Sequence, residues 1–373
     1  MQIDKGALLK AVKKVMPGVG TGKKLLEGSD NIIFSKIGLH SFNREISVTV
    51  PFEYPEGFEL KGTVNAKDLF NLLNSKRLKV ISDSMDVEQL DHGIKFIGNQ
   101  WESVLEFKDD SEWIAEKIET LSSTKCGKEL PTDFTKGLTL CSIPGNTISQ
   151  NGIYAKGTGM YSTDKRVANI YELDTEIDEF WLGQEVVTEF LKVPGVFTHY
   201  ELTDSVMGHW AHFKDMEGSI FSMATKDISV YKSALTFFQK QQDVTPADPR
   251  LCGVLPVGFA DAIEACSMMA EKDKSNGKKP IEIIFTNTAM VVKGIKSGGK
   301  LTNTLPWDDD HTMDLSKEKG SKLKFRFVSS NIVAASRKAK SFFINKINED
   351  ENTCMIVLFS EDFKTILLSL KGV

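Results

Sequence analysis

The chain repeats one structural pattern six times without repeating its letters. Each repeat starts with a strand-like run, passes through a small or polar residue into a short amphipathic helix, and continues in several runs of strand composition. The starts lie at residues 1–15, 58–73, 127–140, 179–191, 250–266 and 323–335. A period of roughly 60 residues is typical of an array of supersecondary units. Such an array predicts a built shape, such as a ring or an arch, more than a pocket around one reaction.

Paired, the six units predict three α+β domains, each a pair of βαβββ units. The predicted domains are residues 1–122, 123–245 and 246–373, and about 120 residues is an ordinary domain size. The stretch 109–128 is charged and rich in Ser and Thr, and the stretch 239–249 is polar with two prolines. Both are predicted to be linkers.

Composition is that of a soluble globular protein, with 41% hydrophobic and 26% charged residues. Lysines interrupt the apolar positions of the first helix, so the N-terminus is not expected to be a signal peptide. The five cysteines are far apart and lack any C-x-x-C pattern, which predicts reduced thiols and a cytoplasmic location. The net charge of -5 argues against a simple basic coat for nucleic acid, but does not say how charge is distributed between faces.

Basic residues gather on one face of the first predicted helix, residues 5–16. Leu8, Val12 and Val15 share the apolar face, and three lysines share the opposite face. Such a face is either merely solvated or a surface that contacts phosphates without reading bases. The candidate DNA-binding residues are Lys10, Lys13, Lys14, Lys23, Lys24, Lys67, Lys76, Arg77, Arg337 and Lys338. The helices near residues 185 and 261 carry acidic residues, so any basic track lies in the first domain and at the end of the third.

Three motifs suggest chemistry but do not meet its requirements. Residues 17–24 resemble a phosphate-binding loop, but Lys24 stands where a Ser or Thr would bind magnesium, and the segment follows a helix. His209 and His212 have no third ligand nearby in an alternating strand-like run. Asp308–Asp310 is better explained as an exposed loop. We therefore expect no catalytic residues, no metal and no cofactor.

One segment carries a more specific signal. Residues 150–168 read QNGIYAKGTGMYSTDKRVA, and they resemble the middle domain of the bacterial β sliding clamp, the beta subunit of DNA polymerase III. In that family an N-G dipeptide begins a strand pair that leads to a T-D-G-H-R-L-A signature. Here Lys165 replaces the Gly-His pair and shortens the turn, and Val167 replaces Leu. The opening LLKAVKKV and the segment TVNAKDLFNLL resemble the first domain of the same family, so the resemblance implies a divergent member, of a kind that a phage could encode.

The resemblance implies a non-catalytic processivity factor. Two chains would close head to tail into a ring, with sheets outside and helices around a hole that encircles duplex DNA. Such a ring tethers a replicative polymerase topologically, so weak and salt-dependent phosphate contacts are sufficient.

The resemblance also implies a pocket for short peptides from a polymerase or clamp loader. Its implied residues are Tyr154, Thr163, Lys165, Arg166, Val167, Ala234, Ile366, Leu368 and Leu370. A shallow apolar cleft of this kind suits an extended peptide. Two alternatives remain: an adaptor that keeps the clamp architecture without encircling DNA, and an α+β enzyme in which Asp308–Asp310 would be the first suspects.

Overall fold

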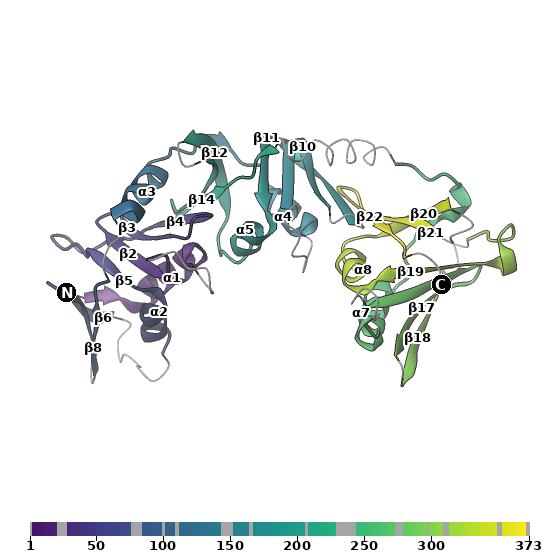
Figure 1. Cartoon of the computed structure of the whole chain (residues 1–373), viewed down its shortest axis with the longest axis horizontal. Helices are drawn as coiled ribbons and strands as arrows, with labels where there is room; N and C mark the ends of the chain where they lie inside the picture. The colour runs from purple at the N-terminus through teal and green to yellow at the C-terminus, as the bar shows by residue number, and fades with distance from the viewer. Residues whose placement is uncertain are drawn as a thin grey trace. The chain divides into compact units, whose positions relative to one another are not determined.

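The computed structural model describes residues 2–20, 28–75, 84–98, 101–108, 112–142, 152–163, 167–205, 208–228, 244–272, 279–296, 298–308, 313–348 and 353–370. Contacts divide the chain into two compact units (Figure 1). The first unit is Met1–Thr132 with Glu185–Lys226, and the second is Asp133–Gln184 with Asp227–Val373.

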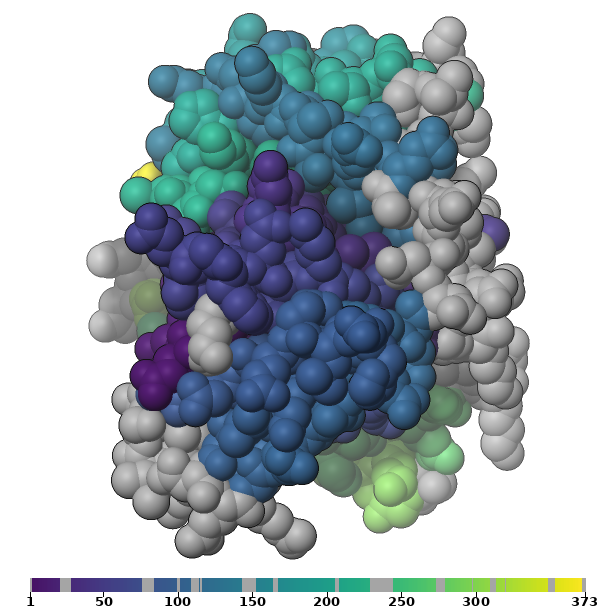
Figure 2. All heavy atoms as spheres, turned by 90° about the vertical axis from the view of Figure 1, so that its left-hand side faces the viewer, coloured from purple at the N-terminus to yellow at the C-terminus, as the bar shows by residue number. Residues whose placement is uncertain are grey.

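The first unit contains an eight-stranded antiparallel sheet in the order β5-β2-β3-β4-β14-β13-β12-β9 and a four-stranded sheet in the order β1-β6-β7-β8. The strands are β1 (Gln2–Asp4), β2 (Asn31–Ser35), β3 (Gly38–Phe42), β4 (Ile46–Pro51), β5 (Gly62–Asn65), β6 (Ser84–Leu90), β7 (Gly93–Gly98), β8 (Trp101–Glu106), β9 (Lys128–Glu129), β12 (Phe197–Ser205), β13 (Gly208–Asp215) and β14 (Ile220–Ala224). Seen from the side of this unit, the purple N-terminal segments lie between the blue segments around β6–β8 and the teal segments around β12–β14 (Figure 2).

Four helices accompany these strands in the described part of the chain: α1 (Lys5–Val15), α2 (Ala66–Asn74), α3 (Glu112–Ser122) and α5 (Gln184–Phe190). Side-chain caps begin the first two. Asp4 accepts a hydrogen bond from the Ala7 amide, and Asn65 accepts hydrogen bonds from the amides of Lys67 and Asp68. Each cap satisfies amides that the first turn of a helix leaves without a backbone partner. The predicted helices over residues 5–16 and 66–76 therefore form, with shorter C-terminal ends.

Helix α3 corrects the prediction of a linker over residues 109–128. Ile114, Ile118 and Leu121 are buried against Phe42 and Trp210. Their i, i+4 and i+7 spacing places them on one face of the helix. The charged residues that suggested a linker are thus one side of an amphipathic helix that covers the eight-stranded sheet.

The eight-stranded sheet joins strands from two of the predicted domains. β4 pairs with β14 in antiparallel register, from Ile46 opposite Met223 to Thr49 opposite Ile220. The division into domains at residues 1–122, 123–245 and 246–373 stays a prediction. The two compact units have other bounds, because each unit contains whole sheets and these sheets include strands from more than one predicted domain.

The second unit contains a six-stranded sheet in the order β10-β11-β22-β21-β20-β15 and a four-stranded sheet in the order β18-β17-β16-β19. The strands are β10 (Gly152–Thr163), β11 (Val167–Gly183), β15 (Cys252–Val254), β16 (Pro280–Thr286), β17 (Ala289–Lys296), β18 (Gly299–Pro306), β19 (Lys322–Val328), β20 (Ser341–Asn348), β21 (Thr353–Phe359) and β22 (Phe363–Leu368). Its helices are α4 (Phe134–Cys141), α7 (Phe259–Met269) and α8 (Ser329–Ser336). α7 and α8 pack side by side.

The predicted α+β class is confirmed. Short 3-10 turns lie at Met16–Gly18, Pro249–Leu251 and Lys319–Ser321. All five cysteine thiols are free. Within the described residues, no helix combines the length and apolar character needed to span a membrane.

Candidate nucleic-acid interface and partner site

Helix α1 presents two of its predicted DNA-binding lysines to solvent. Leu8, Val12 and Val15 are buried beneath the helix, while Lys10 and Lys13 are exposed. Lys13 has no ion-pair partner among the residues that the structure describes. These two cations, three positions apart, therefore form an accessible basic patch on one side of α1.

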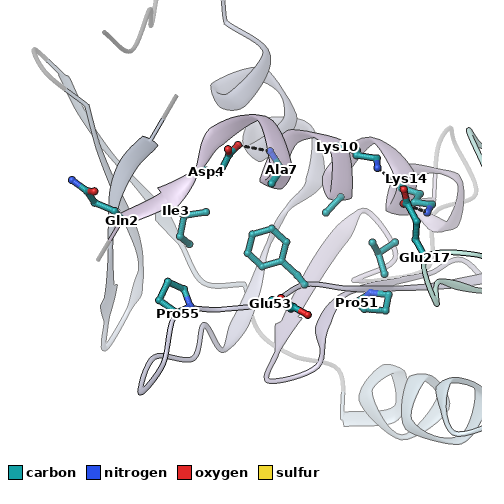
Figure 3. Close-up of a pocket in the computed structure, with 13 residues that line it drawn as sticks. Gln2, Ile3, Asp4, Ala7, Lys10, Lys14, Pro51, Glu53, Pro55 and Glu217 are labelled. Atoms are coloured by element: carbon teal, nitrogen blue, oxygen red, sulfur yellow. Dashed lines mark hydrogen bonds and ion pairs between the residues drawn. The ribbon is translucent and has the colours of Figure 1, made fainter. Parts of the chain in front are cut away.

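Lys14 does not share this exposed face, so its predicted place there is wrong. Its side chain is only 2% exposed, and its ammonium group pairs with Asp215. It also pairs with Glu217 at 2.7 Å (Figure 3). Burial acts to lower the pKa of Lys14, but hydrogen bonds to the two carboxylates outweigh it and raise the pKa. A lysine held in this way is a structural ion pair and not a contact for phosphate.

Asp215 organises the turn between β13 and β14 that receives Lys14. Its side chain accepts hydrogen bonds from the amides of Glu217 and Ser219, at 2.9 and 2.8 Å. Gly218 adopts a left-handed φ of 84°, a conformation that glycine adopts without strain. The turn therefore fixes the backbone from which Glu217 reaches α1.

An open groove of about 320 Å³ lies beside this ion-pair cluster. Its lining comes from β1, α1 and the end of β4, and Glu217 closes one side (Figure 3). Glu217 also accepts from Lys10 at 2.5 Å, and the lysines together lower its pKa to about 2. The carboxylate therefore stays ionised at any physiological pH.

The remaining predicted DNA-binding residues, apart from Lys338, divide into three groups. Lys67 is exposed near the start of α2 and has no ion-pair partner in the described part of the chain. Arg337 pairs with Glu264, which links α8 to α7. Lys23, Lys24, Lys76 and Arg77 lie outside the described residues.

Lys338 is engaged inside the second unit, contrary to the prediction of an available cation. Its ammonium group donates to the carbonyls of Thr139 and Leu140, at 3.1 and 3.0 Å. These carbonyls end α4, where a cation is favourable because the last turn leaves carbonyls without a backbone partner. Burial lowers the pKa of Lys338.

Two predicted pocket residues belong to a buried cluster on one face of the six-stranded sheet. Tyr154 and Ile366 are 1% and 2% exposed, and they pack with Trp181, Phe343 and Val357. The Tyr154 hydroxyl donates to Glu179 at 2.5 Å. Tyr154 and Ile366 are therefore core residues. The prediction that they form an open wall of the peptide pocket is wrong.

Val167 does not lie beside Tyr154 as predicted. It pairs with Leu367, while Ala168 pairs with Ile366. Because successive strand residues point to opposite faces, Val167 joins Leu367 in the core cluster of the other face.

The end of β22 and the residues after it include the more accessible predicted residues. Leu368 and Leu370 are half-buried, and the Leu370 amide donates to the Arg326 carbonyl at 2.7 Å. Thr163 donates to the Val167 carbonyl at 2.8 Å and closes the end of the β10–β11 hairpin. Lys165, Arg166 and Ala234 lie outside the described residues.

A second groove, of about 380 Å³, opens at the opposite end of the β11–β22 pair. Tyr161, Ile170 and Phe359 contribute apolar surface, and Glu172 and Glu361 stand on the rim. The sequence signal that could have found it is the set of aromatic residues on these strands, Tyr161, Tyr171, Phe359 and Phe363.

Two buried histidines, His40 and His212, hold neighbouring strands together. His212 is buried between Thr203 and Ser222, with hydrogen bonds of 2.8 and 2.7 Å, and His40 is held in the same way by Ser35 and Thr49. Burial lowers both pKa values to about 4. Among the described residues, no cluster of His, Cys, Asp or Glu has the makings of a metal site. Asp309 and Asp310 fall outside those residues.

In the described part of the chain, every sheet ends in strands with one unpaired edge, and β8 and β18 are two of these. β8 pairs only with β7, and β18 pairs only with β17. Val104 on β8 is 41% exposed, whereas the exposed Met268 and Ile295 of the second unit lie on α7 and on β17, the neighbour of β18. Unpaired edges with exposed apolar residues are ready to pair with another chain.

Comparison with solved structures identifies the fold. The chain is similar to the beta chain of DNA polymerase III from Streptococcus pneumoniae, with a TM-score of 0.73, 14% identity and coverage of 100% of this chain and 99% of the other. The DNA polymerase sliding clamp from Bacillus subtilis gives 0.71 and 14%, with the same coverage. A Helicobacter pylori beta clamp bound to a DNA ligase peptide also gives 0.71 and 14%, again with the same coverage. No protein-family model and no curated protein matches the sequence. Over its whole length, the chain therefore has the fold of the beta sliding clamps.

Proposed function

We propose that this protein is a DNA sliding clamp, a non-catalytic processivity factor that encircles duplex DNA in the cytoplasm and tethers a replicative polymerase. The observation that carries the proposal is the match to clamp structures over the full length of both chains. A fold that is kept across its whole length at 14% identity points to a role that depends on shape. Shape is the quantity that a topological tether needs.

Lys10, Lys13 and Lys67 are the proposed phosphate contacts in the first unit. All three are exposed. Cations of this kind bind the backbone without reading bases, and each contact adds about 0.9 to the log–log salt slope for duplex DNA. A weak contact of this type permits sliding.

Ring closure by a head-to-tail dimer is supported by the unpaired edges of β8 and β18. Glu102 and Glu106 lie on the exposed face of β8, on either side of Val104. The exposed Lys300 lies on β18. An antiparallel or parallel pairing of these edges would bury Val104 and bring opposite charges together. The proposed dimer thus covers two edges that a monomer would leave open.

Short peptides from a polymerase or clamp loader are the proposed protein partners. The Helicobacter pylori clamp with its DNA ligase peptide is a precedent for a peptide on this fold. Thr163, Leu368 and Leu370 are the described residues of the predicted pocket that keep accessible surface. They are therefore our first choice for the site.

An adaptor that does not encircle DNA is the second candidate. It is favoured by one observation: Lys14, Arg337 and Lys338 are all engaged within the protein. A platform for partners needs fewer free cations than a ring that slides on the phosphate backbone of DNA.

Retention on DNA separates the two candidates. A clamp loaded by its clamp loader should stay on a nicked circular duplex and leave within seconds when the circle is cut to a linear form. An adaptor should show the same lifetime on both. Light scattering after gel filtration adds a second readout, since a dimeric ring has twice the 41.5 kDa chain mass.

A further inference from the structure

We infer that Glu217 is a built-in counter-anion for Lys10, and that it sets how strongly the first unit holds the phosphate backbone of duplex DNA. The inference rests on the proposed function, because it treats the exposed side of α1 as a surface that meets DNA. It adds a residue from a distant part of the sequence that tunes this contact.

One carboxylate serves two lysines of very different accessibility. Glu217 Oε1 lies 2.5 Å from Lys10 Nζ, and Glu217 Oε2 lies 2.7 Å from Lys14 Nζ (Figure 3). The side chains of Lys10 and Glu217 are 63% and 55% exposed, whereas that of Lys14 is 2% exposed. The Lys10 pair can therefore exchange with solutes, and the Lys14 pair cannot.

The buried pair holds the exposed one in place. Lys14 also pairs with Asp215, whose other side-chain oxygen anchors the amides of Glu217 and Ser219. The main chain closes the same turn, because the Gly218 amide donates to the Asp215 carbonyl at 3.1 Å. Glu217 is thus positioned before any ligand arrives and needs little ordering to neutralise Lys10.

An exposed ion pair of this type is worth only about 0.2–1 kcal/mol, so a polyanion can displace it. Lys10 lies three positions before the exposed Lys13, on the same side of α1. With Glu217 in place, Lys10 reaches a phosphate only after releasing its carboxylate. Without it, Lys10 and Lys13 both contact phosphates directly.

The test measures binding of a fluorescein-labelled 30-base-pair duplex by anisotropy, from about 0.05 to 0.3 M salt. Glu217→Gln keeps the shape of the side chain and leaves the Lys14–Asp215 pair intact. We expect the log–log salt slope to steepen by about 0.9. If the two proteins bind equally at 1 M salt, this slope corresponds to an affinity about eightfold higher for the variant at 0.1 M salt. Equal slopes for the wild type and Glu217→Gln would overturn the inference.

Two further variants locate the effect. Glu189→Gln removes another exposed carboxylate, paired with Lys192 at 2.6 Å, and changes the net charge by the same amount. We expect it to leave the slope unchanged; a gain equal to that of Glu217→Gln would reduce the effect to net charge and reject the inference. Lys10→Gln should cancel the gain in the Glu217→Gln background, and a gain that persists would likewise reject Lys10 as the responsible group.

Retention on circular DNA reports on the proposed function separately. If the wild type fails to persist on a circle while Glu217→Gln still binds the short duplex more tightly, the clamp role fails and the inference stands. If retention is normal and the duplex affinities are equal, the inference fails and the clamp role stands.

Discussion

Lys14 of α1 and Asp215 of the β13–β14 turn form a buried ion pair within the first unit, with side chains 2% and 1% exposed. The pair joins the first helix of the chain to a hairpin that follows it by some two hundred positions in the sequence. Burial makes Asp215 depend on Lys14, because without the ammonium group its carboxylate would stay buried with no counter-charge.

Lys14→Met should therefore be strongly destabilising. Removing one partner of a buried pair costs about 3–5 kcal/mol, because the remaining charge stays buried. Lys10→Met is the matched control, because Lys10 lies on the same helix and pairs with the same carboxylate, Glu217. It should lower the free energy of unfolding by less than about 1 kcal/mol. Urea unfolding measures both. Similar small losses for the two variants would show that Lys14 is not the structural member of the cluster.

Stability should fall on mild acidification because of His40 and His212. Their pKa values in the folded protein are about 4, below the ordinary value of 6.5. Between these values the unfolded chain binds more protons than the folded one, so stability is lost as the pH falls from 6.5 towards 4. Each histidine contributes at most about 1.4 kcal/mol per pH unit.

The window from pH 6.5 to 5 isolates this effect, because ordinary carboxylates are still ionised there. The free energy of unfolding, measured by urea at several pH values, should slope downward in the wild type. His212→Gln should reduce the slope by about half, because His40 still titrates, and should lower stability at pH 7. An unchanged slope would mean that His212 is not the group that titrates.

Leu370→Ala should separate a pocket role from a core role at the end of the chain. Leu370 is half-buried, whereas Ile366 is 2% exposed within a packed cluster. We expect Ile366→Ala to cost about 2–5 kcal/mol. Leu370→Ala should cost clearly less and weaken a polymerase-derived peptide, measured by calorimetry. A large drop in melting temperature with normal peptide affinity would exclude the pocket assignment.

Deleting residues 368–373 would be a poorer test of the pocket than Leu370→Ala. The Ser369 amide donates to the Cys354 carbonyl at 3.0 Å, and the Leu370 amide donates to the Arg326 carbonyl. The deletion would break these links to β21 and β19 together, so loss of stability would accompany any loss of binding.

Val104→Glu should weaken the proposed ring. Val104 is 41% exposed on the unpaired strand β8, and a new charge there would face the partner strand. Val196→Glu is the control, since Val196 is 63% exposed in a loop of the same unit. Sedimentation equilibrium should show a weaker dimer for the first variant alone. An equal effect of both variants would argue against β8 as the contact.

The sequence predicted the elements well because their signals are local. The cap at Asp4 and the apolar spacing after it define α1, and alternating residues define most strands. Helix α3 was missed for a local reason as well: Ile114, Ile118 and Leu121 have helical spacing, but their charged neighbours dominated the composition.

The site was harder to predict because it depends on distant partners. No local pattern around Lys14 indicates Asp215 or Glu217, so three lysines on one predicted face could not be sorted into exposed and buried. Alternation in the last strand correctly separates Ile366 from Leu367. It does not say which of the two faces is covered, and that decides whether Tyr154 and Ile366 line a pocket or fill a core.

The pairing of β4 with β14 has a consequence for work with pieces of this chain. A fragment that ends near residue 122 would keep β4 but lose β14, and so would leave the backbone from Ile46 to Thr49 without its neighbour. That edge includes Val48, which is fully buried in the intact protein. An edge of this kind promotes aggregation, so the first third of the chain should be difficult to express alone, and cuts that spare the whole eight-stranded sheet should give better-behaved fragments.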